Sequence, residues 1–342
     1  MSIANRPTLS DVAKLAGVSV ATASRALSNP DLVAEGTRHA VRDAAQSCGY
    51  KVNLVARSLR MQRTNTILVL TPCIDNPFYP GLLRGIEDAA HDRGFSVIVG
   101  FTLKRPESCQ PYSDLLSNGR VDGVVVIDGG TNMQGLTGPR PSVPAVQVLD
   151  MIYGPAVSAV RVDDHQVAEL AVRHLAGLGH RRIAHISGAQ ESIAAVHRRE
   201  GYLNTLAALG LPADERLIEC GFYRREPAAE AMQKLLSLGM PPTAVFCAND
   251  TMATGALRAC QDRGLRVPDH MSIVGAGNTF DGEITEPPLT TIHVPRHDIG
   301  MLAAERLIGL IKGQGSMPHD TVVPVELMTR GSTSSARAIA AA

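Results

Sequence analysis

Residues 9–27 constrain the fold of this chain most, because they contain two short helical patterns separated only by a tight turn. Apolar residues at helical spacing precede Gly17, which can adopt the left-handed conformation that ends a helix. Ser19 can then cap a second helix at 20–27. With the small Ala13 where the helices would cross, this spacing predicts a helix-turn-helix.

The second predicted helix carries small and polar residues that fit a DNA groove. Arg25 can pair with guanine through two hydrogen bonds, typically worth about 1–3 kcal/mol of discrimination, and hydroxyls at a helix N-terminus suit phosphates. The alternative is an ordinary helical hairpin with solvated polar residues. The candidate DNA-contacting residues are Ser19, Val20, Ala21, Thr22, Ser24 and Arg25.

Charge divides unevenly along the chain, although its formal net charge is zero. Nine of the 33 Lys and Arg residues, but only four of the 33 Asp and Glu residues, lie within 1–65. A basic end on an acidic body favours a local polyanion-binding module. A third helix at 35–48 would complete a DNA-binding domain at 1–50, followed by a short helical segment and linker at 51–65.

Beyond Thr66, short apolar runs alternate with helical stretches, which predicts doubly wound parallel sheets. There are more strands than one modest sheet requires, so we expect two lobes with a ligand at the carboxyl ends of their strands. The predicted strands are 67–70, 96–99, 123–127, 146–149, 183–186, 244–247 and 272–274. The predicted helices are 79–93, 165–178, 198–209, 227–238, 251–263 and 297–312.

These features together resemble the LacI/GalR (lactose repressor) family over nearly the whole chain, and its cytidine repressor branch in particular. The resemblance implies a small all-α helix-turn-helix domain and an α/β periplasmic-binding-protein-like body of two doubly wound parallel-sheet lobes. The matching stretches are 17–19, 24–25, 55–59, 67–72, 121–124, 179–183, 242–247 and 288–292.

The resemblance also implies how the body is divided. The chain would cross between lobes near 161–163, 292–294 and 318–324, giving one lobe at about 66–161 with 294–320 and another at about 163–290 with 322–332. The Ser-, Thr- and Ala-rich composition of residues 333–342 independently predicts a disordered tail. In the linker, Leu59 would wedge into a central base step in the minor groove, with Ala56 close to the DNA; the alternative for Leu59 is a linker leucine.

An effector site follows from the same resemblance. Three residues near this site also have a purely structural interpretation. Phe246 could be a core residue, Asp250 a helix cap, and Asp163 a brace for the crossover between the lobes. The family commonly has a ligand-binding Asp where this chain has Gly277, so Asn278 or a water replaces it, or the ligand differs from a simple hexose or pentose. A nucleoside or sugar-like effector is the resulting hypothesis. The implied effector-binding residues are Asn76, Phe78, Tyr79, Asp128, Arg198, which opens a helix of the second lobe, Phe246, Asn249 and Asn278.

Catalysis is not indicated by any motif. The chain lacks a P-loop, a His-Glu-x-x-His, a Gly-x-Ser-x-Gly and a dinucleotide fingerprint. Asp75 and Asp128 could be imagined as an acid/base pair, but two carboxylates in a sugar-type pocket more often accept hydroxyl hydrogen bonds. The six scattered cysteines have no metal-ligand spacing and read as buried thiols. We therefore expect no catalytic residues, cofactor or metal.

The expected protein is a cytoplasmic transcription regulator. No secretion signal or membrane-spanning run is apparent, which disfavours a periplasmic solute-binding protein and a membrane partner. A homodimer would grip half-sites of a pseudo-palindromic operator about one helical turn apart. The sequence leaves open the operator, the effector and the sign of its effect; tetramers also stay open, although the C-terminus has no leucine heptad.

Overall fold

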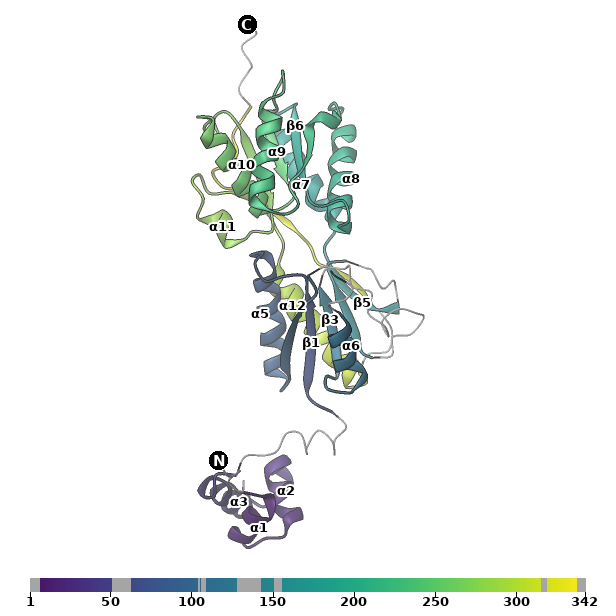
Figure 1. Cartoon of the computed structure of the whole chain (residues 1–342), viewed down its shortest axis with the longest axis vertical. Coiled ribbons are helices and arrows are strands. Elements are labelled where there is room, and N and C mark those ends of the chain that lie inside the picture. Colours follow the sequence, from purple (N-terminus) through teal and green to yellow (C-terminus); the bar gives the residue numbers. More distant parts are fainter. Residues whose placement is uncertain are drawn as a thin grey trace. The chain divides into compact units, whose positions relative to one another are not determined.

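The computed structural model describes residues 7–50, 63–103, 105, 109–127, 143–150, 156–314 and 319–336. The chain divides into two compact units, Met1–Thr64 and Asn65–Ala342 (Figure 1). Within the described ranges, no helix combines the length and the apolar character that crossing a membrane would require.

The first unit contains the predicted helix-turn-helix and third helix. Its elements are α1 (Leu9–Leu15), α2 (Val20–Ser28), a 3-10 turn (Pro30–Leu32) and α3 (Glu35–Ser47). Gly17 has a φ of 66°, and Ser19 caps α2, as predicted. Helix α1 begins at Leu9, because Thr8 and Asp11 form a reciprocal capping box.

The second unit consists of two α/β lobes, each built on a six-stranded sheet with the orders β11-β5-β4-β3-β1-β2 (lobe 1) and β12-β10-β9-β8-β6-β7 (lobe 2). The strands of lobe 1 are β1 (Thr66–Thr71), β2 (Ser96–Phe101), β3 (Gly123–Ile127), β4 (Ala145–Val148), β5 (Ser158–Arg161) and β11 (Asp320–Val322). Those of lobe 2 are β6 (Ile183–Ser187), β7 (Ile218–Cys220), β8 (Ala244–Cys247), β9 (Ser272–Ala276), β10 (Thr290–His293) and β12 (Glu326–Met328).

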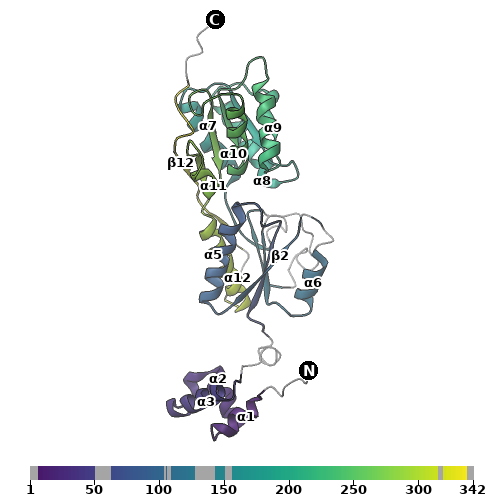
Figure 2. The same ribbon diagram turned by 60° about the vertical axis from the view of Figure 1, so that its left-hand side comes forward.

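Helices cover both faces of each sheet, because alternate residues of the buried strands point to opposite sides. In β1, Ile67 and Val69 pack towards α5 and α12, whereas Leu68 and Leu70 pack towards α6. Figure 2 shows α5 and α12 on one side of this sheet and α6 on the other. In β8, Phe246 joins the core under α7 and α8, and Val245 joins the core under α9 and α10. The helices are α5 (Phe78–Asp92), α6 (Gln110–Ser117), α7 (Asp164–Gly177), α8 (Ile193–Ala208), α9 (Arg225–Leu236), α10 (Asp250–Asp262), α11 (Phe280–Glu283) and α12 (Arg296–Ile311).

The chain passes between the lobes three times in the described part, from β5 to α7, from β10 to α12 and from β11 to β12. Strand β12 pairs with β10 in the antiparallel direction. The sheet of lobe 2 is therefore mixed, whereas a parallel sheet was predicted. Seven elements were not predicted from the sequence, namely β5, β7, β10, β11, β12, α6 and α11.

Two further predictions are corrected by the structure. Residues 333–336 are not a disordered tail, because Ser334 bonds to Ser272 and the Ala336 amide donates to the Leu178 carbonyl; residues 337–342 lie outside the described residues. Three cysteines are half-buried rather than buried, namely Cys48, Cys73 and Cys220.

Candidate functional site

Helix α2 presents an exposed face opposite the small core of the first unit. Ala23 and Ala26 are buried against α1 and α3, whereas Val20 is 48% exposed and Arg25 is exposed. Ala21 is also exposed, and Thr22 and Ser24 are half-buried.

The start of α2 is fixed by Ser19 and Thr22. The Ser19 Oγ accepts from the Thr22 amide at 3.0 Å and lies 2.8 Å from the Thr22 Oγ1. The structure therefore groups the six predicted DNA-contacting residues of this region on one short helix and its cap.

A cleft of about 1000 Å³ lies in the second unit and is lined by segments that follow the carboxyl ends of strands in both lobes. This is where parallel sheets of this type bind ligands. Four of the predicted effector-binding residues line this cleft: Asn76, Phe78 and Tyr79 from lobe 1, and Asn249 from lobe 2. A fifth is Arg198.

Arg198 also lines the cleft, but it lies inside α8 rather than at its start. Helix α8 begins at Ile193 because Ser192 caps it through the Ala195 amide. The Arg198 Nε lies 2.7 Å from the Asp164 Oδ1, and Nη1 donates to the Ala248 carbonyl. Because both side chains of this ion pair are at least 90% buried, the guanidinium is held in one orientation.

Sequence reasoning missed several residues of the cleft, notably Phe222 and Tyr223 after β7. Both have left-handed backbones, with φ of 52° and 58°, and the Tyr223 ring packs directly on Gly188. This turn leaves Phe222 56% exposed in the cleft. An apolar ring presented in this way can cover a flat or apolar ligand face. Other missed residues of the lining include Asp150, Ser192, Arg105 and Asp281.

Phe246 is placed in the core instead of the cleft lining, as the alternative interpretation held. It is fully buried and stacks on His185, with ring centroids 4.9 Å apart. His185 also stacks on Tyr202, and its Nδ1 lies 3.0 Å from the Phe246 carbonyl. Burial lowers the pKa of His185 to about 4, so the ring is neutral.

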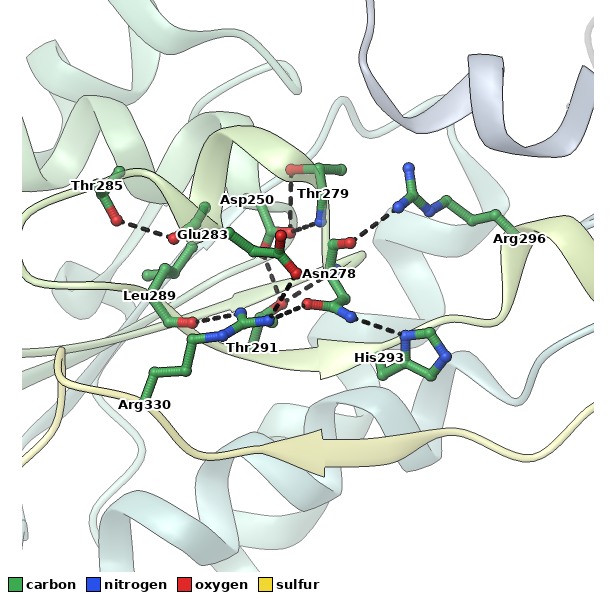
Figure 3. Close-up of polar contacts among 11 residues, drawn as sticks. Asp250, Asn278, Thr279, Glu283, Thr285, Leu289, Thr291, His293, Arg296 and Arg330 are labelled. Atoms are coloured by element: carbon green, nitrogen blue, oxygen red, sulfur yellow. Dashed lines mark hydrogen bonds and ion pairs between the residues drawn. The ribbon is translucent and has the colours of Figure 1, made fainter. Parts of the chain in front are cut away.

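Asp250 does not cap α10, contrary to the alternative we considered. Asn249 is the cap, accepting from the Met252 amide at 2.8 Å. The fully buried Asp250 carboxylate instead accepts hydrogen bonds from the Thr279 amide at 2.6 Å and from the Thr291 Oγ1 at 2.6 Å (Figure 3). Burial raises the pKa of Asp250. Asp163 caps α7 at a lobe crossing, accepting from the His165 amide.

Asn278 points into a polar network of lobe 2, and the cleft lining does not include it (Figure 3). Its Oδ1 accepts from Arg330 at 2.6 Å, and its Nδ2 lies 3.0 Å from the His293 Nδ1. The amide is therefore occupied, and Asn278 does not extend into the cleft in place of the absent carboxylate at Gly277. Asp128, Ala56 and Leu59 lie outside the described residues.

Comparison with known proteins matches both units. Residues 8–53 match the family described as "Bacterial regulatory proteins, lacI family", and residues 172–333 match "Periplasmic binding protein-like domain". The chain is 36% identical over 328 residues to the HTH-type transcriptional repressor CytR of Escherichia coli (strain K12), covering 95% of this chain and 96% of that protein. This chain belongs to the LacI family.

Other relatives of this LacI family member agree. The HTH-type transcriptional repressor PurR of Actinobacillus pleuropneumoniae serotype 5b (strain L20) is 34% identical, covering 89% of this chain and 91% of that protein. A lac repressor dimer bound to operator and the anti-inducer ONPF has a TM-score of 0.83 at 28% identity, covering 96% of this chain and all of that one. A transcriptional regulator CelR–cellobiose complex has a TM-score of 0.71 at 31% identity, with the same coverage.

Family membership confirms the predicted class. The chain is a transcription regulator that joins a helix-turn-helix DNA-binding domain to a two-lobed, periplasmic-binding-protein-like body for a small-molecule effector.

Proposed function

We propose that this LacI family protein represses transcription as a homodimer on a pseudo-palindromic operator, with the exposed face of α2 in the major groove. The observation that carries this proposal is the burial of Ala23 and Ala26, which directs Val20, Ala21 and Arg25 outward together. The relatives named as repressors, and the lac repressor dimer on its operator, support it. Such a regulator acts in the cytoplasm, where it meets chromosomal DNA.

The role of Arg25 can be tested by selecting preferred binding sites from random DNA. Arg25→Ala should relax the base preference at one position of each half-site, because a guanidinium paired with guanine contributes about 1–3 kcal/mol of discrimination. Arg42→Ala, an exposed arginine of α3, is the control and should leave the selected sequence unchanged. If the Arg25→Ala protein selects the same sequence as the wild type, Arg25 does not recognise a base.

The linker contact is proposed from the family resemblance alone. Leu59→Ala should weaken binding to the selected operator much more than binding to random DNA, because a minor-groove wedge acts only where the protein bends a specific site. Equal losses on both DNAs, measured by fluorescence anisotropy at fixed salt, would contradict the wedge and favour a plain linker leucine.

We propose that the cleft binds a nucleoside or sugar-like effector. Phe78 and Phe222 offer aromatic faces, and Asp150, Asn249 and Arg198 offer acceptors and donors for hydroxyl groups. The relative solved as a complex with cellobiose supports the sugar-like part of this class. Anisotropy on operator DNA, titrated with cytidine, adenosine and ribose, tests it; no change in DNA affinity and no heat of binding with any of them would overturn this class.

We propose no catalytic activity for the cleft. Of its buried acidic residues, Asp164 is paired with Arg198 and serves to orient the guanidinium. The relatives are named as transcriptional regulators. Turnover of a bound nucleoside, detected by chromatography of the recovered ligand, would contradict this part of the proposal.

A further inference from the structure

Arg296 connects the two lobes through one side chain. It is the first residue of α12, immediately after the chain has crossed from β10 in lobe 2 back to lobe 1. Its Nη1 donates to the Pro77 carbonyl in lobe 1 at 3.1 Å, and its Nη2 donates to the Asn278 carbonyl in lobe 2 at 2.8 Å. Figure 3 shows the guanidinium reaching towards Asn278. Because a guanidinium is planar, both bonds hold only at one spacing and orientation of the two carbonyls.

The lobe 1 end of this link belongs to the wall of the cleft. Pro77 and Phe78 both line the cleft at the start of α5, and the Arg296 guanidinium carbon lies 5.8 Å from the centroid of the Phe78 ring. Arg296 itself is absent from the cleft lining. A ligand that displaces the Phe78 ring would therefore affect Arg296, which packs over that ring, although the ligand itself does not contact Arg296.

The lobe 2 end is anchored by the polar network around Asn278. The Asn278 backbone is left-handed, with a φ of 52°, and its side chain is bonded to Arg330 and lies beside His293. Arg330 also donates to the Leu289 carbonyl at 2.8 Å and lies 3.2 Å from Glu283. With its side chain held on both sides, Asn278 presents its carbonyl as a fixed acceptor for Arg296.

We propose that Arg296 is a positioning residue that couples ligand binding in the cleft to the relative orientation of the lobes. It joins a contact that faces the ligand, the Phe78 ring, to one that is held inside lobe 2, the Asn278 carbonyl. A shift of Phe78 on ligand binding alters the Arg296–Asn278 bond, so the ligand gains a differential interaction with the two lobe arrangements. This inference rests on the proposed function of the cleft.

The chain offers a matched control on the same helix. Arg306 of α12 makes three guanidinium hydrogen bonds, compared with two for Arg296: to the Ala159 carbonyl at 3.0 Å, the His319 carbonyl at 2.9 Å and the Thr321 Oγ1 at 2.6 Å. All of these partners lie in lobe 1 or at its edge, so Arg306→Met removes a comparable set of bonds without cutting a link between lobes. Arg296→Lys keeps the charge but loses the forked geometry.

Hydrogen exchange of the full-length protein tests the link without any ligand. Arg296→Met should accelerate exchange in peptides covering 77–83 of lobe 1 and 277–283 of lobe 2 together, whereas Arg306→Met should leave both at the wild-type rate. Wild-type exchange in either peptide of Arg296→Met would overturn the proposal. Because this arm needs no effector, it gives its answer even if the proposed effector class is wrong.

The coupling is measured with cytidine as the probe. In Arg296→Met and Arg296→Lys, the affinity for cytidine by calorimetry should stay within about threefold of wild type, while the factor by which cytidine changes operator affinity should fall at least about fivefold. Arg306→Met should preserve that factor. An unchanged factor in the Arg296 variants, or an equal loss in Arg306→Met, would overturn the proposal; failure of cytidine to act on wild type would count against the effector class alone.

Discussion

Arg198 and Asp164 form a buried ion pair in the wall of the cleft, with 2.7 Å between the Arg198 Nε and the Asp164 Oδ1. The pair joins α8 to the first residue of α7, so it stabilises lobe 2 while it orients a group that faces the ligand. A single substitution of Arg198 therefore confounds folding with binding.

We predict that Arg198→Met lowers the free energy of unfolding by about 3–5 kcal/mol, because it leaves the buried Asp164 carboxylate without its cation. The double variant Arg198→Met/Asp164→Asn should recover much of that loss but still bind cytidine weakly. Urea unfolding and calorimetry measure the two effects. If the double variant is no more stable than Arg198→Met, the ion pair does not explain the cost.

Substitutions of Phe222 and Phe246 should affect ligand binding and protein stability separately. Phe222→Ala should weaken cytidine binding about tenfold or more with little loss of stability, because its ring is 56% exposed in the cleft. Phe246→Leu should lower the free energy of unfolding by about 1–2 kcal/mol, because a fully buried, stacked ring is lost from the core. Titration calorimetry and urea unfolding of both variants check this, and the reverse pattern would contradict the placement of both rings.

Gly277 stands where the family resemblance places a carboxylate, and both its backbone conformation and the neighbouring Asp250 carboxylate disfavour one here. Its φ is 126°, and an added Cβ would lie 3.4 Å from the Phe78 Cδ2 and 3.5 Å from the Asp250 Oδ2. Gly277→Asp should therefore destabilise the protein by about 1–3 kcal/mol through backbone strain, with a further loss from the repulsion between the two carboxylates.

The control Gly277→Ala carries the strain without the charge, so the difference between the two variants measures the repulsion. Adding Asp250→Asn to Gly277→Asp should reduce that difference. Thermal unfolding at pH 7 measures all three. A Gly277→Asp protein as stable as wild type, with tighter nucleoside binding, would show that the position still serves the ligand.

Local signals explain which elements could be predicted from the sequence. Gly17 and Ser19 fix the turn and the start of α2 through their own backbone and side chain, so that motif was readable. Strands such as β1 and β3 are continuous apolar runs, because both faces of the sheet are covered. In contrast, β11 is a three-residue strand with exposed ends that exists only because Asp320 pairs with Ala159, far away in the chain.

The candidate site was predictable only in part, for a similar reason. Asn76, Phe78 and Asn249 follow continuous apolar strands and were found, whereas Phe222 follows β7, which has the sequence Ile-Glu-Cys and no apolar run. Nothing in a Phe-Tyr pair indicates the left-handed turn that exposes it. Phe246 was assigned to the cleft because a strand buried on both faces does not show in its sequence which face a residue takes.

His185 should make the stability of lobe 2 depend on pH. The folded protein holds its pKa at about 4 through burial, compared with 6.5 for an ordinary histidine. Its Nε2 has no hydrogen-bond partner among the described residues, so a proton there would be a buried, unpaired donor. Because the unfolded chain binds this proton more readily, the stabilising contribution is complete above pH 6.5 and is lost as the pH falls towards 4.

The full effect amounts to about 3 kcal/mol, since each pKa unit corresponds to about 1.4 kcal/mol. We predict that His185→Phe, which retains a ring between Tyr202 and Phe246, flattens the dependence of the unfolding free energy on pH between 6.5 and 4. Burial also lowers the pKa values of His174 and His180, so part of the slope should persist in this variant. His91→Gln, at an exposed position on α5, should leave the slope unchanged. Urea unfolding across this pH range measures it, and an unaltered slope in His185→Phe would mean that the buried ring does not titrate as the structure requires.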